Sequence, residues 1–174
     1  MQAEKKLSTR DLALLSVYGA LMMAAQVAMA PLPNIEPVTP LLMCCALVYG
    51  RLAFYPCGIF VLLEGLIYGF GPWFVNYLYV WPILICAVLL LRKVGSFVVW
   101  TIVAGAFGLC FGALCAIPYF FIGGWEMGFS YWVAGIPFDL LHCVGNAVMS
   151  ALLLKPLTLV LGRLSAPGGE NHMR

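Results

Sequence analysis

The chain has 174 residues, of which 64% are hydrophobic and only 9% are charged, and its mean hydropathy is +1.01. These values exclude a water-soluble globular protein, because a soluble core of this size needs many more charged residues to form its surface. The composition therefore predicts an all-α integral membrane protein, and its length leaves room for five or six spans of about 20 residues.

Apolar segments alternate with short breaks along the whole chain. We expect six membrane spans, at residues 11–30, 38–50, 52–71, 74–91, 96–121 and 132–154. The basic residues precede the first span, follow the last, or occupy alternate breaks: Lys5, Lys6, Arg10, Arg51, Arg92, Lys93, Lys155, Arg163 and Arg174. Because basic residues are retained on the cytoplasmic side, this pattern predicts a six-helix transmembrane bundle with both termini in the cytoplasm. Residues 1–164 are expected to form one transmembrane domain, and 165–174 a short polar disordered tail.

The first span begins after a basic segment and ends in Ala28-Met29-Ala30, which resembles a signal-peptide cleavage site. We expect the span to be retained, because it is long for a signal peptide and Pro31 would follow the cut. Small residues at Ala20, Ala24 and Ala28 form a flat stripe that permits close approach of another membrane helix. A second stripe, Ala104, Gly108, Gly112 and Ala116, is expected to serve packing within the bundle.

The loop at residues 31–40 contains four prolines together with Asn34 and Glu36. Proline restricts the backbone to extended or turn geometry, so this loop is expected to be stiff. It is either a lid over an outward-facing pocket or a tight connector, and we favour the lid.

Polar and aromatic residues gather in the expected outer half of the bundle. Those we assign to a pocket from this half are Glu64, Tyr68, Trp73, Asn76 and Trp125. An interfacial aromatic belt would explain the rings, but a belt does not require a carboxyl group inside a membrane span. Interleaved rings and polar groups favour a flat, ring-containing ligand held by stacking and hydrogen bonds.

The last span carries Asp139, His142 and Asn146, whose spacing places them on one face of a helix. We assign these three residues to substrate binding, as one wall of an outward-facing pocket; the alternative, which does not exclude the first, is a buried polar network that holds helices together. A metal site is not expected, because the spans contain no second histidine.

Sequence motifs for nucleotide binding, hydrolysis and dinucleotide binding are absent, so we expect no cofactor, no catalytic residue and no nucleic-acid partner. Two alternatives to a ligand-binding membrane protein remain open. One is an intramembrane enzyme that uses Glu64, Asp139 and His142 as acid–base groups. The other is a bacterial membrane scaffold in which the polar residues only hold the helices together.

Several segments resemble the substrate-binding S component of energy-coupling factor (ECF) transporters. They are the last span with its Leu-Lys-Pro-Leu ending at 154–157, the small-residue segment at 18–25, and the segments at 33–38 and 63–69. The resemblance implies a multi-pass protein of the bacterial cytoplasmic membrane that takes part in uptake of a vitamin or similar micronutrient. It also implies three partners in the lipid bilayer and cytoplasm, namely a transmembrane coupling subunit, which would dock on Ala20, Ala24 and Ala28, and two cytoplasmic ATPases.

The charge of the expected outer half constrains the small-molecule substrate. Glu36, Glu64, Glu126 and Asp139 are placed there, with no lysine or arginine nearby. Because a strongly anionic ligand would meet unfavourable charge, we expect a neutral or cationic ligand that donates hydrogen bonds to Glu64 or Asp139.

Overall fold

The computed structural model describes residues 8–32 and 35–165, so Asn34 of the expected lid and residues 166–174 of the expected tail lie outside the described part. The helices are α1 (Thr9–Met29), α2 (Val38–Tyr49), the short 3-10 helix η1 (Gly50–Ala53), α3 (Phe54–Tyr68), α4 (Pro72–Leu91) and α5 (Phe97–Ser165). No strand occurs in the described part. The expectation of an all-α protein is confirmed.

Local sequence explains where several helices begin and end. The Ser8 side chain accepts a hydrogen bond from the Asp11 N–H at 3.0 Å, and the Asp11 carboxylate accepts one from the Ser8 N–H at 3.3 Å, so the two residues form a capping box for α1. Gly50 and Gly69 end α2 and α3 with positive φ angles of 62° and 86°, which glycine adopts without strain. Pro72 starts α4, where its missing N–H costs no helical hydrogen bond.

Four helical stretches are long and apolar enough to cross a membrane: Thr9–Met29, Val38–Tyr68, Pro72–Leu91 and Phe97–Ser165. Many large apolar side chains are exposed on the outside of the molecule, as expected where lipid is the solvent. The chain is therefore a membrane-embedded protein.

The expected count of six spans is not supported. Helices α2 and α3 have only 12 and 15 residues, and together with η1 they form one stretch of 31 residues. Most of the loop expected between the fifth and sixth spans is also helical, so that α5 covers 69 residues as two helical arms joined at a kink. Only Gly123 and Gly124 depart from helical geometry there. Glycine adopts such backbone angles without strain, so these two residues are enough to reverse the direction of the chain.

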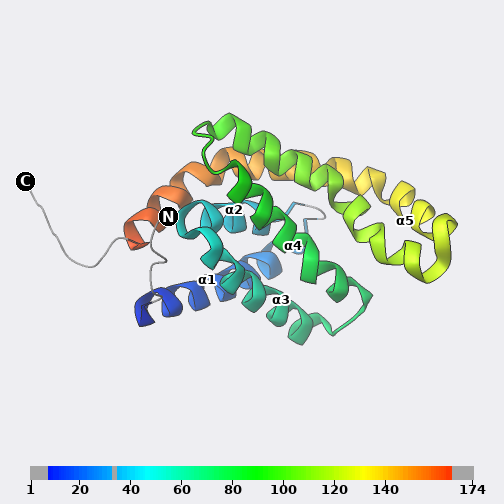
Figure 1. Cartoon of the computed structure of the whole chain (residues 1–174), viewed down its shortest axis with the longest axis horizontal. Coiled ribbons are helices and arrows are strands. Elements are labelled where there is room, and N and C mark those ends of the chain that lie inside the picture. Colours follow the sequence, from blue (N-terminus) through cyan, green and yellow to red (C-terminus); the bar gives the residue numbers. More distant parts are fainter. Residues whose placement is uncertain (1–7, 33–34, 166–174) are drawn as a thin grey trace, which may run out of the picture.

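Helix α5 is thus a hairpin, with a first arm at residues 97–122 and a second arm at residues 125–165 (Figure 1). The arms touch backbone to backbone near Gly108, where an added Cβ would lie 2.7 Å from the carbonyl carbon of His142. At Gly112, an added Cβ would collide with the Asp139 carboxylate. The stripe of small residues in the first arm therefore packs inside the molecule, as expected from the sequence.

Helix α2 lies at the centre of the bundle. Every residue from Val38 to Ala46 is buried, which is typical of a helix enclosed by others on all sides. The Tyr18 hydroxyl donates to the Leu41 carbonyl at 2.7 Å and links α1 to α2. On the other side of the core, the ring of Phe60 meets that of Trp81 edge to face at 5.8 Å and links α3 to α4.

The chain reverses direction at each break between helices (Figure 1). The start of α1, the α2–α3 junction, the α4–α5 connection and the end of α5 lie at one end of the molecule. Basic residues occur in all four of these segments. The α3–α4 connection and the tip of the α5 hairpin lie at the opposite end.

Candidate functional site

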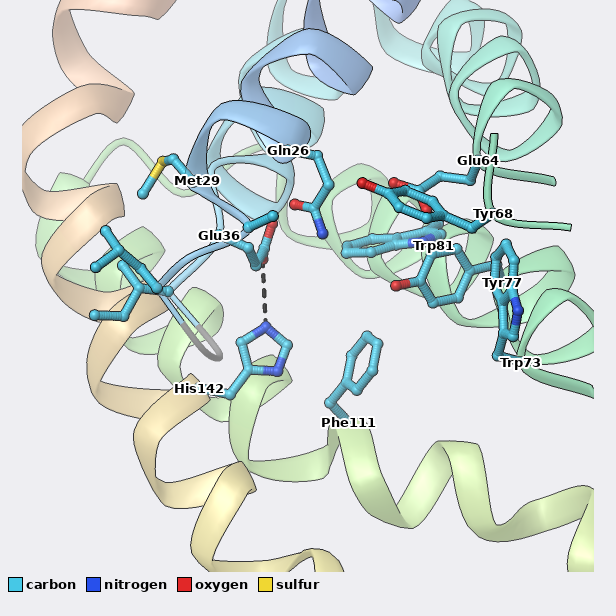
Figure 2. Close-up of a pocket in the computed structure, with 13 residues that line it drawn as sticks. Gln26, Met29, Glu36, Glu64, Tyr68, Trp73, Tyr77, Trp81, Phe111 and His142 are labelled. Carbon is cyan, nitrogen blue, oxygen red and sulfur yellow. Dashed lines mark hydrogen bonds and ion pairs between the residues drawn. The ribbon is translucent and has the colours of Figure 1, made fainter. Parts of the chain in front are cut away.

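A cavity of about 400 Å³ lies between the end of α1, the loop that follows it, α3, α4 and both arms of α5 (Figure 2). This volume falls within the range of small-molecule sites. Its lining residues are Gln26, Met29, Ala30, Leu32, Ile35, Glu36, Glu64, Tyr68, Trp73, Tyr77, Trp81, Phe111 and His142.

Aromatic rings form one wall of the cavity. Trp73, Tyr77 and Trp81 follow one another at four-residue spacing on α4, and successive ring centroids lie 5.3 and 5.5 Å apart. Phe111 extends the row from α5, with its centroid 5.8 Å from that of Trp81. The contacts along α4 are edge to face and that of Phe111 with Trp81 is tilted at 57°, and together they hold the rings in fixed orientations. The wall therefore offers preformed aromatic surfaces to a flat ligand.

Glu36 and His142 form the polar link on the opposite side of the cavity (Figure 2). The His142 Nε2 lies 3.3 Å from the Glu36 Oε1, and the Glu36 Oε2 accepts a hydrogen bond from the Thr39 N–H at 2.9 Å. Phe111 meets the His142 ring edge to face at 4.8 Å. The link therefore fixes the α1–α2 loop against the second arm of α5.

Three lining residues have a buried polar atom without a hydrogen-bond partner among the described residues. They are the Oε1 of Gln26, the Oε1 of Glu64 and the Nε1 of Trp81. Figure 2 shows Glu64 and Trp81 on one side of the cavity and Gln26 between them and Glu36. Buried polar groups are normally paired, and an unpaired one costs about 1–3 kcal/mol. A ligand that reaches these groups would relieve that cost.

The lining of the cavity contains acidic side chains but no lysine or arginine. Its titratable groups include two carboxyl groups, those of Glu36 and Glu64, and the imidazole of His142. Glu64 is only 4% exposed and belongs to α3, opposite the Glu36–His142 link. Such a cavity favours a cation or a neutral hydrogen-bond donor over an anion.

Of the residues expected from the sequence to bind substrate, four line this cavity: Glu64, Tyr68, Trp73 and His142. Glu36 of the expected lid lines it as well. The structure therefore brings together residues that lie up to 106 positions apart in the sequence.

The other expected site residues lie elsewhere. Asn76 is buried and accepts a hydrogen bond from the Tyr79 hydroxyl at 3.1 Å, while Asn146 donates to the Thr39 hydroxyl at 3.1 Å. Trp125 lies next to the tip of the α5 hairpin, is 74% exposed and stacks on Phe129. Trp125 does not line the cavity, and the tip of the α5 hairpin extends beyond the other helices (Figure 1).

Asp139 does not line the main cavity. Its Oδ1 accepts a hydrogen bond from the Gly112 N–H at 2.8 Å, and the residue lines a separate space of about 370 Å³ between the arms of α5. His142 and Phe111 contribute to both spaces and thus stand between them. The polar face of the last span is therefore divided, and the acid–base alternative with Glu64, Asp139 and His142 has no single cavity that holds all three.

Sequence reasoning did not assign Gln26, Tyr77, Trp81 and Phe111 to the site. The four-residue spacing of Trp73, Tyr77 and Trp81 was a usable signal, since it places three rings on one helix face. Gln26 was a second signal, because it is a polar residue in an apolar span. Phe111 carried no signal, since its position depends on how the α5 hairpin packs.

The link between Thr39 and Asn146 gives a first testable prediction. Replacing Thr39 by valine removes the acceptor of the Asn146 amide, and both side chains are fully buried. We expect the free energy of unfolding to fall by about 1–2 kcal/mol, because a buried donor loses its partner. Thermal unfolding in detergent, followed by circular dichroism, measures the change.

The double variant Thr39→Val/Asn146→Leu is the matched control. Removing both partners should recover part of the lost stability, since two apolar groups leave no unpaired donor. Equal stability of Thr39→Val and the wild type would contradict the hydrogen bond.

The helices and the site define a membrane-embedded, all-helical protein with an aromatic, acidic cavity near one end of its bundle. Comparison of the chain with family models, with curated proteins and with solved structures finds no match.

Proposed function

We propose that the protein binds a cationic or neutral, ring-containing small molecule in the cavity of Figure 2. The observation that carries this proposal is the pairing of an aromatic wall with buried polar atoms that have no partner. The ring of the ligand would lie against Trp73, Tyr77 or Trp81. A donor or cationic group would face Glu64, and an acceptor on the ligand would take the N–H of Trp81.

We further propose six membrane crossings with both termini on the cytoplasmic side of a bacterial membrane. The crossings would be α1, α2, α3, α4 and the two arms of α5. Support comes from the reversal of the chain at each break and from the basic segments that share one end of the molecule (Figure 1). In this orientation the α3–α4 connection and the α5 tip face outward. Helices as short as α2 would then require local thinning of the bilayer or burial of their ends by neighbouring helices.

The most specific form of the proposal is that the protein is the substrate-binding subunit of an ATP-driven, ECF-type importer of a vitamin or similar micronutrient. The segments that resemble S components support it, together with the lack of an ATP-binding motif in the chain. The partners would be a transmembrane coupling subunit and two cytoplasmic ATPases.

The stripe Ala20, Ala24 and Ala28 supports the same proposal. All three residues are exposed on α1, so the stripe is free to meet another membrane helix. Small side chains are what close helix contacts in lipid require, because packing rather than hydrophobicity holds such helices together.

Purification of the tagged protein from its native membrane in mild detergent tests both parts of the proposal. Native mass spectrometry is expected to reveal a bound, non-anionic small molecule that contains a ring. Two ATPase subunits and a membrane subunit are expected to copurify. A bound ligand without these partners would refute the transport role alone, and a phosphorylated or multiply carboxylated ligand would refute the assignment of the cavity.

Replacing Ala24 by leucine is expected to reduce copurification of the ATPase subunits at least several-fold, because the larger side chain holds a partner helix away from the stripe. Ligand binding should be unchanged, since Ala24 does not line the cavity. Quantitative immunoblotting of the purified complex measures the effect. Ala151→Leu, an equal enlargement at another exposed alanine, should leave copurification unchanged.

A further inference from the structure

A second feature lies at the basic end of the molecule, away from the ligand cavity. A groove of about 550 Å³ is lined by Arg51, Phe54, Cys86, Leu89, Leu90 and Arg92. It lies where η1, which follows α2, meets the last turns of α4. The groove thus combines two cationic side chains with apolar ones.

The two arginines of the groove have no counter-charge in the described structure. The guanidinium groups of Arg51 and Arg92 have no hydrogen bond or ion pair with a described residue, and both residues are exposed. The groove is lined by no acidic residue. Two positive charges therefore share one groove without compensation, which favours an anionic ligand.

The backbone explains how the arginines come to face the same groove. The positive φ of Gly50 ends α2, and η1 then places Arg51 beside α4. Arg92 is the C-cap of α4, where a cation also interacts favourably with the helix dipole. Both positions thus lie at helix ends that face the same groove.

An apolar strip leads away from the arginines along α4. Cys86, Leu89 and Leu90 are spaced at i, i+3 and i+4, so they share one face of the helix. Cys86 lies six residues before Arg92, which is roughly 9 Å along the helix at 1.5 Å per residue. Leu90 is 83% exposed and Cys86 is also exposed, while Leu89 is half-buried against the core, so the outer part of this face is open. The strip therefore suits a hydrocarbon chain that runs parallel to α4.

Only a ligand with both an anionic and an apolar part uses the whole groove. Guanidinium groups bind phosphate oxygens through paired, charge-assisted hydrogen bonds. A soluble phosphate would leave the apolar strip uncovered, and a neutral hydrocarbon would leave the two charges unpaired. An anionic phospholipid supplies both parts, and a membrane-embedded protein meets it continuously.

We propose that this groove binds one anionic phospholipid, with its phosphate held by Arg51 and Arg92 and an acyl chain along Cys86, Leu89 and Leu90. The proposal does not depend on the ligand of the main cavity. In the orientation proposed above, the groove faces the cytoplasmic leaflet, where anionic lipids attract basic groups.

The test compares lipids and charge variants on the full-length protein in detergent. Native mass spectrometry with added dioleoylphosphatidylglycerol is expected to show one tightly bound lipid, at least about tenfold more tightly held than dioleoylphosphatidylcholine. The variant Arg51→Gln/Arg92→Gln should lose this preference, with binding about tenfold to thirtyfold weaker for the loss of two charges. The matched control Lys155→Gln/Arg163→Gln removes two other exposed charges and should keep it.

A third variant tests the apolar strip. Cys86→Trp fills the strip but keeps both arginines, and it should weaken binding of phosphatidylglycerol several-fold. All variants should melt within about 2 °C of the wild type without added lipid, because exposed side chains contribute little to stability.

Four results would overturn the assignment. The first is equal binding of the two lipids by the wild type, and the second is an undiminished preference in Arg51→Gln/Arg92→Gln. The third is full displacement of the lipid by millimolar inorganic phosphate, which would identify a simple anion site. Loss of the preference in both charge variants alike would also overturn it, because general surface charge would then explain the binding.

Discussion

Replacing Glu64 by glutamine is expected to weaken binding of the cavity ligand by about tenfold to a hundredfold, since a hydrogen bond to a charged group contributes about 1.5–3 kcal/mol. Glutamine keeps the size of the side chain and removes its capacity to carry a negative charge. Glu64 is almost fully buried, and its Oε1 has no partner among the described residues, so no protein group substitutes for the ligand. Isothermal titration with the molecule identified by mass spectrometry measures the loss.

Glu126→Gln is the control for this experiment. Glu126 lies on the exposed tip of the α5 hairpin and does not line the cavity, so the same chemical change there should leave affinity unaltered. If Glu64→Gln binds the ligand as tightly as the wild type, the ligand does not contact this carboxyl group. An equal loss in both variants would indicate attraction by overall charge rather than a contact.

Replacing Gly108 by alanine is expected to have the largest effect on the fold. The added Cβ would lie 2.7 Å from the carbonyl carbon and oxygen of His142 and 2.8 Å from the backbone nitrogen of Cys143. Backbone atoms cannot rotate away, so the arms of α5 must separate. We expect the free energy of unfolding to fall by about 1–3 kcal/mol in Gly108→Ala. The decrease should be larger in Gly108→Val, because valine adds more atoms at the contact.

Gly58→Ala is the matched control for the glycine experiment. An added Cβ at Gly58 meets no atom within 4 Å, and the residue is exposed within a helix. Alanine there should leave the melting temperature unchanged or raise it slightly, because alanine favours helix by up to about 1 kcal/mol over glycine. Similar melting temperatures for Gly108→Ala and Gly58→Ala would contradict the close contact between the arms.

The two predictions are connected through the α5 hairpin. Phe111 comes from its first arm and His142 from its second, and their rings meet on the cavity wall. Separation of the arms would therefore disturb the cavity as well as the fold. Gly108→Ala should thus weaken ligand binding even at temperatures where the protein remains folded.

Part of the candidate site was predictable from the sequence. Glu64 and His142 are polar groups in apolar spans, and such groups face a protein interior or a cavity because lipid offers them no partners. Both residues line the cavity, as this argument predicts. The same argument did not distinguish Asp139 and Asn146, which are equally costly in lipid but form hydrogen bonds with Gly112 and Thr39 away from the cavity. The Oδ2 of Asp139 and the Oδ1 of Asn146 are buried without a partner among the described residues.

The sequence by itself determined the membrane-embedded, all-helical character, since hydropathy and the need to pair every backbone group in lipid leave few alternatives. It also placed breaks after residue 50 and between residues 71 and 74, close to where α2 ends at Gly50 and α4 begins at Pro72, but it extended the third span past Gly69, where α3 ends. Only the tertiary structure decided how the spans are joined and which polar residues share the cavity. These features depend on the close approach of helices at Gly108 and Gly112, which is a property of facing surfaces and not of either segment alone.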